Sequence, residues 1–132
     1  MKTLILVIAL ATATLTSNAY ANDNLAAIMK HMGADWKTIA TQISDATKNA
    51  STIATVNDLI QQINLAKQET PDTVASGAQT EADFQAQLTG VQTTATQLLA
   101  ALQAGDNATA VGLLSTIKTA KDNGHNQFDP QN

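Results

Sequence analysis

LAAIMKHMGADWKTIATQISDA, residues 25–46, is the stretch that decides the fold. Its apolar side chains recur at alternating steps of four and three residues, which is the period of one face of a helix packed in a bundle. The series is Leu25, Met29, Met32, Trp36, Ile39, Ile43 and Ala46. We therefore expect an amphipathic helix with one buried face.

The same helical period returns three times farther along the chain. The second series is Ile53, Val56, Leu59, Ile63 and Ala66; the third is Phe84, Leu88, Val91, Ala95, Leu98 and Leu102; the fourth is Val111, Leu114, Ile117, Lys121, His125 and Phe128. A polar break at residues 48–51 separates the first two series, and no strand-like alternation competes with the helical pattern. The pattern predicts an all-α protein with four helices.

The segments between the series predict how these helices connect. Residues 68–80 contain Pro71, Gly77 and small polar residues, which indicates the one long loop. Thr80 followed by Asp83 resembles a capping box, and the turn at Gly105 precedes Asp106 and Asn107, either of which is a plausible N-cap. Because the other two connections are short, neighbouring helices run antiparallel, and we expect an up-down-up-down four-helix bundle.

Residues 1–21 predict a secretory signal peptide. Lys2 provides the positive start, Leu4 to Ala11 the apolar core, and Ala19-Tyr20-Ala21 an A-x-A cleavage site. The apolar run is shorter than the roughly 20 residues that span a bilayer. We therefore expect a mature domain at residues 22–132, exported to a bacterial periplasm without insertion into a membrane.

Composition excludes several classes of function. The chain has no cysteine, which rules out thiolate metal sites, iron–sulfur clusters and thioether-linked haem. The predicted mature domain has six lysines, no arginine and eleven carboxylates, a balance that disfavours binding to nucleic acid or anionic lipid. The sequence has no nucleotide-binding or hydrolase motif. No serine or threonine lies one helical turn from a histidine, so no activated hydroxyl is indicated. Glu81 and Asp83 are paired carboxylates, but they fall at a helix start, where acidic residues are expected. An enzyme is not expected.

The two histidines differ in their placement. His31 follows Met29 by two residues and so points about 200° away from the apolar face, as an exposed histidine would. His125 follows Leu114 by eleven residues, which returns it to within about 20° of the core face. Taken alone, such a histidine is usually structural and such a methionine usually packs. In an antiparallel bundle, however, Met29 and His125 lie at the same end, where a thioether and an imidazole can bind a haem iron from its two faces.

The chain resembles the cytochrome b562 family and, more distantly, the cytochromes c′, over nearly all of the predicted mature domain. Met29 matches the axial methionine of the family, Asp83-Phe84 an Asp-Phe pair whose ring lines the haem pocket, and His125 the axial histidine. The remaining matches are Trp36, Lys37 and Ile39 on an L-K-x-I pattern, residues 66–71 (AKQETP) at the second-helix exit, and Lys118-Thr119 on L-K-T-x-R-x-x-x-H.

Three positions depart from the family. The arginines near the haem propionates are absent, and only Lys121 occupies such a position. Leu88 replaces a second pocket aromatic, and Gly124 replaces the aromatic residue before the histidine in an Asn-Gly pair that commonly ends a helix. The C-x-x-C-H of cytochromes c′ reads KDNGH at residues 121–125, which implies a haem held without covalent attachment.

The resemblance implies a monomeric periplasmic electron carrier that binds one haem b and passes electrons to a redox partner not yet identified. Met29 and His125 would be the axial ligands of the iron, and Lys121 the cation near the propionates. The apolar walls would be Met32, Phe84, Leu88 and Leu114. The alternative is a haem-free periplasmic helical bundle that acts by binding, as a degenerate relative of the family.

Overall fold

The computed structural model describes the backbone of residues 5–128 and the side chains of residues 23–128. Within this part of the chain the regular elements are all helices: α1 (Ile5–Gln42), η1 (Ala46–Lys48), α2 (Asn49–Ala66), α3 (Asp72–Ala75), α4 (Glu81–Gln103) and α5 (Asn107–Phe128). The predicted signal peptide, residues 1–21, lies outside the residues whose side chains are described. Cleavage after Ala21 therefore stays a prediction.

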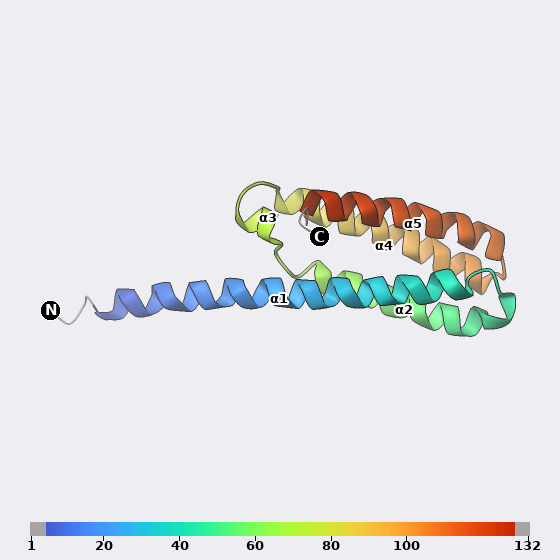
Figure 1. Ribbon diagram of the computed structural model, residues 1–132, viewed down its shortest axis with the longest axis horizontal. Coiled ribbons are helices and arrows are strands. Elements are labelled where there is room, and N and C mark those ends of the chain that lie inside the picture. The colour runs from blue at the N-terminus through green and yellow to red at the C-terminus, as the bar shows by residue number, and fades with distance from the viewer. Residues whose placement is uncertain (1–4, 129–132) are drawn as a thin grey trace.

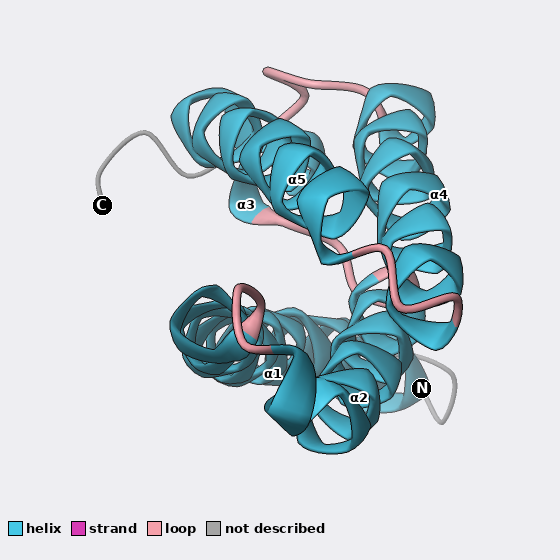
Figure 2. Cartoon of the chain, turned by 90° about the vertical axis from the view of Figure 1, so that its right-hand side faces the viewer, coloured by secondary structure: helices cyan, strands magenta, loops and turns pink. Residues whose placement is uncertain are grey.

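The four long helices form the predicted up-down-up-down bundle (Figure 1). Among the described residues, the long helices that pack closely are α1 with α2, α2 with α4, and α4 with α5. Seen from the end of the bundle, the helices therefore make an open C, with α1 and α5 as its two edges (Figure 2). Within the same range, no helix is long and apolar enough to cross a membrane.

The core follows the predicted apolar series closely. All six residues of the third series are buried, and so are four of the five in the second, where Ile53 is only partly buried. Thr52 is buried beside Ile53, and its hydroxyl donates a hydrogen bond to the Lys48 carbonyl oxygen at 3.0 Å. Its polar atom is thus satisfied by the preceding turn of the chain.

Four residues of the predicted core series are exposed instead: Ala46, Val111, Lys121 and His125, of which the last two line the cavity described below. Helix α1 ends at Gln42, so Ala46 falls in η1 and is exposed. In α5, Val111 is 42% exposed and Ala110 is fully buried in its place. At about 100° per residue, Ala110 lies about 20° from Ile117 around the helix, whereas Val111 lies about 120° away. Val111 was predicted in the core because it is the more hydrophobic of the two, but its side of the helix faces away from the core.

The predicted helix starts carry the expected caps. The Thr80 hydroxyl accepts a hydrogen bond from the Asp83 amide at 3.1 Å. At the start of α5, Gly105 takes a positive φ of 74°, and the Asp106 carboxylate accepts from the Thr109 amide at 3.1 Å. Asp106 is therefore the N-cap, while the Asn107 side chain donates to the Ile43 carbonyl oxygen at 2.7 Å and ties α5 to the end of α1.

The Asn123-Gly124 pair does not end α5, which continues to Phe128. Gly124 instead allows a close approach of α4. A Cβ atom at this position would lie 3.1 Å from Gln87 Nε2, and this same nitrogen donates to the Ala120 carbonyl oxygen at 2.5 Å. The missing side chain thus makes room for the contact between α4 and α5, and His125 stays on a continuous helix.

Candidate functional site

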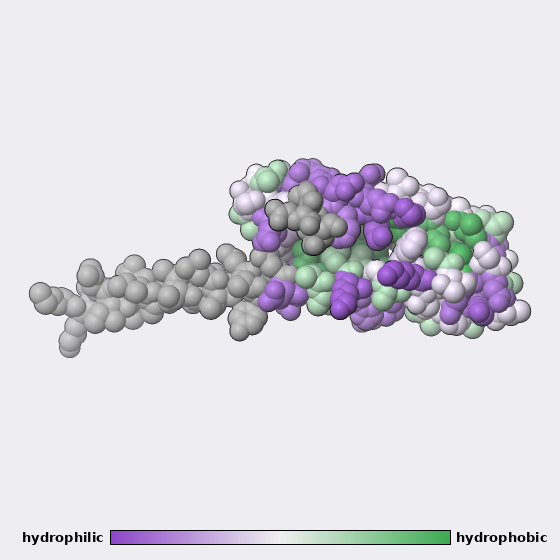
Figure 3. Space-filling view, viewed as in Figure 1, coloured by the Kyte–Doolittle hydropathy of each residue, from purple (hydrophilic) through white to green (hydrophobic). Residues whose placement is uncertain are grey.

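A cavity of about 810 Å³ opens between the two edges of the bundle, α1 and α5. Its floor comes from α4 and from Leu59 of α2, and residues 71–73 at the start of α3 close one end. Its size lies within the 300–1,000 Å³ that is usual for small-molecule and cofactor sites. The surface view shows apolar side chains between hydrophilic ones along this side of the molecule (Figure 3).

All six residues selected from the sequence as cofactor-binding line this one cavity: Met29, Met32, Phe84, Leu88, Lys121 and His125. Leu114, expected as a further wall, is buried in the core but does not line the cavity, and Ile117 takes that place one turn later. Met29 and His125, nearly one hundred positions apart in the sequence, therefore line the same cavity.

Met29 and His125 come from the two helices that form the edges of the cavity. The Met29 side chain is half-buried, whereas His125 is exposed although its helical face is that of the core. The two observations agree because the face of α5 that carries His125 borders the open cavity between α5 and α1. A side chain that lines an open cavity remains able to bind what enters it.

The apolar wall of the cavity is built around two phenylalanines. Phe84 on α4 and Phe128 on α5 are buried and meet edge to face, with ring centroids 5.3 Å apart. Such pairs contribute about 0.5–1.5 kcal/mol beyond the burial of their area. Leu88 lies one turn after Phe84 and extends the same wall. The sequence pattern placed Phe128 in the core but did not mark it as part of the site.

Trp36 and Lys121 form a polar part of the lining, and of the two only Lys121 was predicted from the sequence as a site residue. The Lys121 ammonium lies 5.1 Å from the centre of the Trp36 ring. The Trp36 Nε1 atom is buried and has no hydrogen-bond partner among the described residues, although such donors normally find one. Trp36 follows Met29 by seven residues on the same helical face, which is the signal that marks it as a lining residue. A ligand with an oxygen acceptor would satisfy this donor.

An acidic side chain, Asp122, lies among the basic side chains of α5 near the cavity. The Lys118 ammonium lies 2.8 Å from the Asp122 carboxylate, and this hydrogen bond is the main cause that lowers the pKa of Asp122. The charges of Lys121 and His125 lower it further. Asp122 therefore stays ionised and partly offsets the positive charge of this end of α5.

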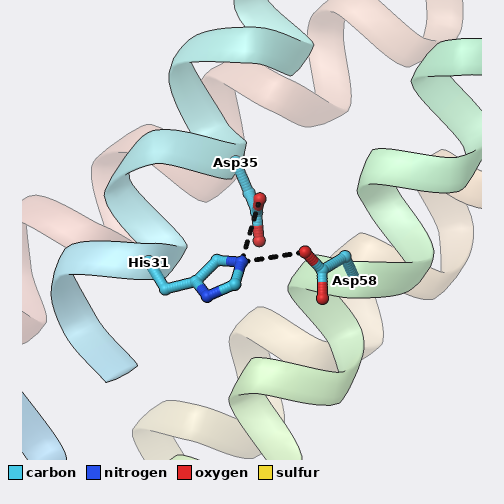
Figure 4. Close-up of side chains that lie close together, drawn as sticks. All are labelled: His31, Asp35 and Asp58. Atoms are coloured by element: carbon cyan, nitrogen blue, oxygen red, sulfur yellow. Dashed lines mark hydrogen bonds and ion pairs between the residues drawn. The ribbon is translucent and has the colours of Figure 1, made fainter. Parts of the chain in front are cut away.

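His31 lies outside the cavity, as its position on α1 predicted. Its ring points toward α2, where Nε2 is 2.9 Å from an oxygen of Asp58 and 3.7 Å from one of Asp35 (Figure 4). The exposure of His31 is confirmed, but the sequence did not reveal its two carboxylate neighbours.

The donor set of the cavity fits a haem. It offers a thioether and an imidazole from facing edges, an apolar wall, an indole donor without a partner among the described residues, and the ammonium groups of Lys30 and Lys121. The model of the cytochrome b562 family matches residues 24–129, which include every residue of this set. Neither the curated proteins nor the solved structures that were compared gave a match. Because this family model matches most of the chain, the chain belongs to the cytochrome b562 family.

Proposed function

We propose that this protein is a periplasmic electron carrier that holds one haem b non-covalently, with Met29 and His125 as the axial ligands. Membership of the family implies a haem-binding electron carrier. The observation that carries the finer assignment is that a thioether and an imidazole line the same cavity from its two opposite edges.

The two proposed ligands suit electron transfer better than catalysis. Haem bound between a methionine and a histidine supplies a one-electron couple whose potential the thioether raises. With Met29 and His125 both holding the iron, no position for a substrate would remain on it. The protein's own task is to hold these two side chains on α1 and α5 at a fixed separation.

The other lining residues exclude water and orient the ligand. Met32, Phe84 and Leu88 present apolar surface to the macrocycle, and Phe84 is itself almost fully buried. Lys121 provides a cation for the acidic side chains of the haem, and the Trp36 indole provides a donor. The lysine is a point charge rather than a planar fork, so it attracts an anion with less directional control than an arginine would.

The absence of cysteine supports non-covalent attachment, because a thioether link to haem requires a thiol. The proposed location rests on the pattern of residues 1–21, with its positive start, apolar core and A-x-A site. A redox partner with a basic surface would complement the acidic composition of the chain, which carries a net charge of −4.

A visible absorption spectrum of the purified protein tests this proposal. Protein produced with export and a haem supply should be coloured, and reduction should give the sharp split bands of a six-coordinate low-spin haem. Acidified organic solvent should then remove all haem from the polypeptide. A colourless protein that takes up no added haem would favour the haem-free binding bundle instead, and haem left on the chain after extraction would contradict the b-type assignment.

A further inference from the structure

His31, Asp35 and Asp58 form a cluster between α1 and α2 (Figure 4). None of the three lines the cavity. His31 and Asp35 are one turn apart on α1, and Asp58 comes from α2. His31 Nε2 lies 2.9 Å from Asp58 Oδ2 and 3.7 Å from Asp35 Oδ1. One atom from each of the three residues lies within 4.8 Å of the other two.

Asp35 is the unusual member of this cluster. Its side chain is only 10% exposed, and its Oδ2 atom is buried without a hydrogen-bond partner among the described residues. Burial and the neighbouring Asp58 carboxylate raise the pKa of Asp35, while His31 acts in the opposite direction. A buried carboxylate oxygen without a partner is costly, and a second carboxylate beside it adds repulsion. A positive charge between the three side chains would remove both costs.

We infer that His31, Asp35 and Asp58 bind a divalent first-row transition metal ion of the zinc type. Zn²⁺ binds imidazole nitrogen and carboxylate oxygen at about 2.0–2.2 Å, which in a tetrahedral site puts ligand atoms about 3.4 Å apart. The two distances from His31 Nε2, 2.9 and 3.7 Å, bracket that value. The imidazole favours Zn²⁺ over Mg²⁺ or Ca²⁺, which prefer oxygen ligands alone.

The exposure of the cluster matches three protein ligands and one water. The side chains of His31 and Asp58 are 48% and 40% exposed, so the outer side of the site faces solvent while Asp35 closes its inner side. The ion would join two ligands on α1 to one on α2. It would thereby stabilise the packing of α1, which carries Met29, against α2. None of its three ligands lines the cavity.

Calorimetric titration of Zn²⁺ into the chelator-treated full chain tests this inference. We expect saturable binding of one Zn²⁺ per chain and a rise in Tm with Zn²⁺. His31→Ala, Asp35→Asn and Asp58→Asn should each weaken binding at least tenfold, since the loss of even an outer-sphere partner costs about 10–100-fold. Asp23→Asn, an exposed carboxylate three turns earlier on α1, should bind as tightly as the parent chain.

Nuclear magnetic resonance separates this site from the cavity. Zn²⁺ should shift the ring signals of His31 and leave those of His125 in place. Three results would overturn the inference: no saturable binding up to millimolar Zn²⁺, unchanged binding by His31→Ala, or a shift at His125 alone. If Zn²⁺ leaves the Tm of the parent chain unchanged, the inference fails too.

Discussion

The ammonium of Lys121 on α5 lies 5.1 Å from the centre of the Trp36 ring on α1. This contact joins the two edge helices of the bundle, which are not among the closely packed helix pairs of the described residues. A cation over an exposed aromatic face contributes about 0.5–1 kcal/mol, a small tie across a cavity of about 810 Å³. Under the proposed function, a haem held between α1 and α5 would add stabilisation that this contact alone does not supply.

Lys121→Gln should weaken haem binding without abolishing it. The side chain is 42% exposed, so the lost attraction to the acidic groups of the haem is worth about 0.2–1 kcal/mol, a rise in Kd of roughly 1.4- to fivefold. The effect should shrink at high salt because exposed charges are screened. Haem titrations at two salt concentrations measure it. Lys118→Gln is the matched control, since Lys118 pairs with Asp122 and does not line the cavity; an equal loss there would contradict a specific role for Lys121.

Replacement of the two proposed axial ligands should have different consequences. Imidazole is the stronger ligand of iron, so His125→Ala should lose most of the haem. Met29→Ala should keep haem, become partly high-spin, bind carbon monoxide or imidazole more readily and shift to lower potential, because the ligand that favours ferrous iron is gone. Haem content, visible spectra and redox titration measure these changes.

The same pair of variants can also contradict the assignment. If Met29→Ala leaves both spectrum and potential unchanged, Met29 only packs in the cavity wall. Met32, which lines the same cavity, is then the next candidate for the ligand, and Met32→Ala would be the variant that lowers the potential.

His31→Ala should leave haem content and spectrum unchanged while it weakens Zn²⁺ binding at least tenfold. The physical reason is direction: His31 faces Asp58 on α2, and His125 lines the cavity. His125→Ala should show the reverse pattern, with haem lost and Zn²⁺ binding retained. Parallel haem and Zn²⁺ titrations of both variants measure this. Loss of low-spin haem in His31→Ala but not in His125→Ala would show that the wrong histidine was assigned to the iron.

Asp35→Asn should stabilise the metal-free protein at neutral pH by about 1 kcal/mol, the size expected when a buried unsatisfied group gains partners. The pKa of Asp35 is raised by burial and by Asp58, so its ionised form is less favourable in the folded than in the unfolded chain. The parent chain should therefore lose stability as pH rises from the ordinary carboxyl range through the raised pKa, and the advantage of the variant should shrink at acid pH. Urea denaturation at several pH values measures the difference.

The matched control for this variant is Asp23→Asn, which replaces an exposed carboxylate on the same helix and should leave the free energy of unfolding unchanged. If Asp35→Asn is less stable than the parent chain at neutral pH, the attraction between Asp35 and His31 outweighs the cost of burial.

The sequence alone determined the elements of the bundle, because helical periodicity is a local property. The buried series from Phe84 to Leu102 and the Thr80 cap were predicted in full, since each depends on residues within a few turns. For the N-cap of α5, the sequence left two neighbouring candidates, Asp106 and Asn107, of which Asp106 is the cap. The prediction was wrong at Val111, which was chosen because it is more hydrophobic than its neighbour Ala110. The angle around the helix instead places the small residue Ala110 in the core.

Only the tertiary structure determined the separation of the two edge helices, α1 and α5, and the cavity between them. The sequence put Met29 and His125 at the same end of the bundle, but the open cavity depends on how far α1 stands from α5, which no local pattern encodes. The exposure of His125 and the unpaired Trp36 indole follow from that separation. The spacing of His31 and Asp35 was visible in the sequence, whereas Asp58 joins them only because the lateral packing of α2 against α1 sets which turns meet.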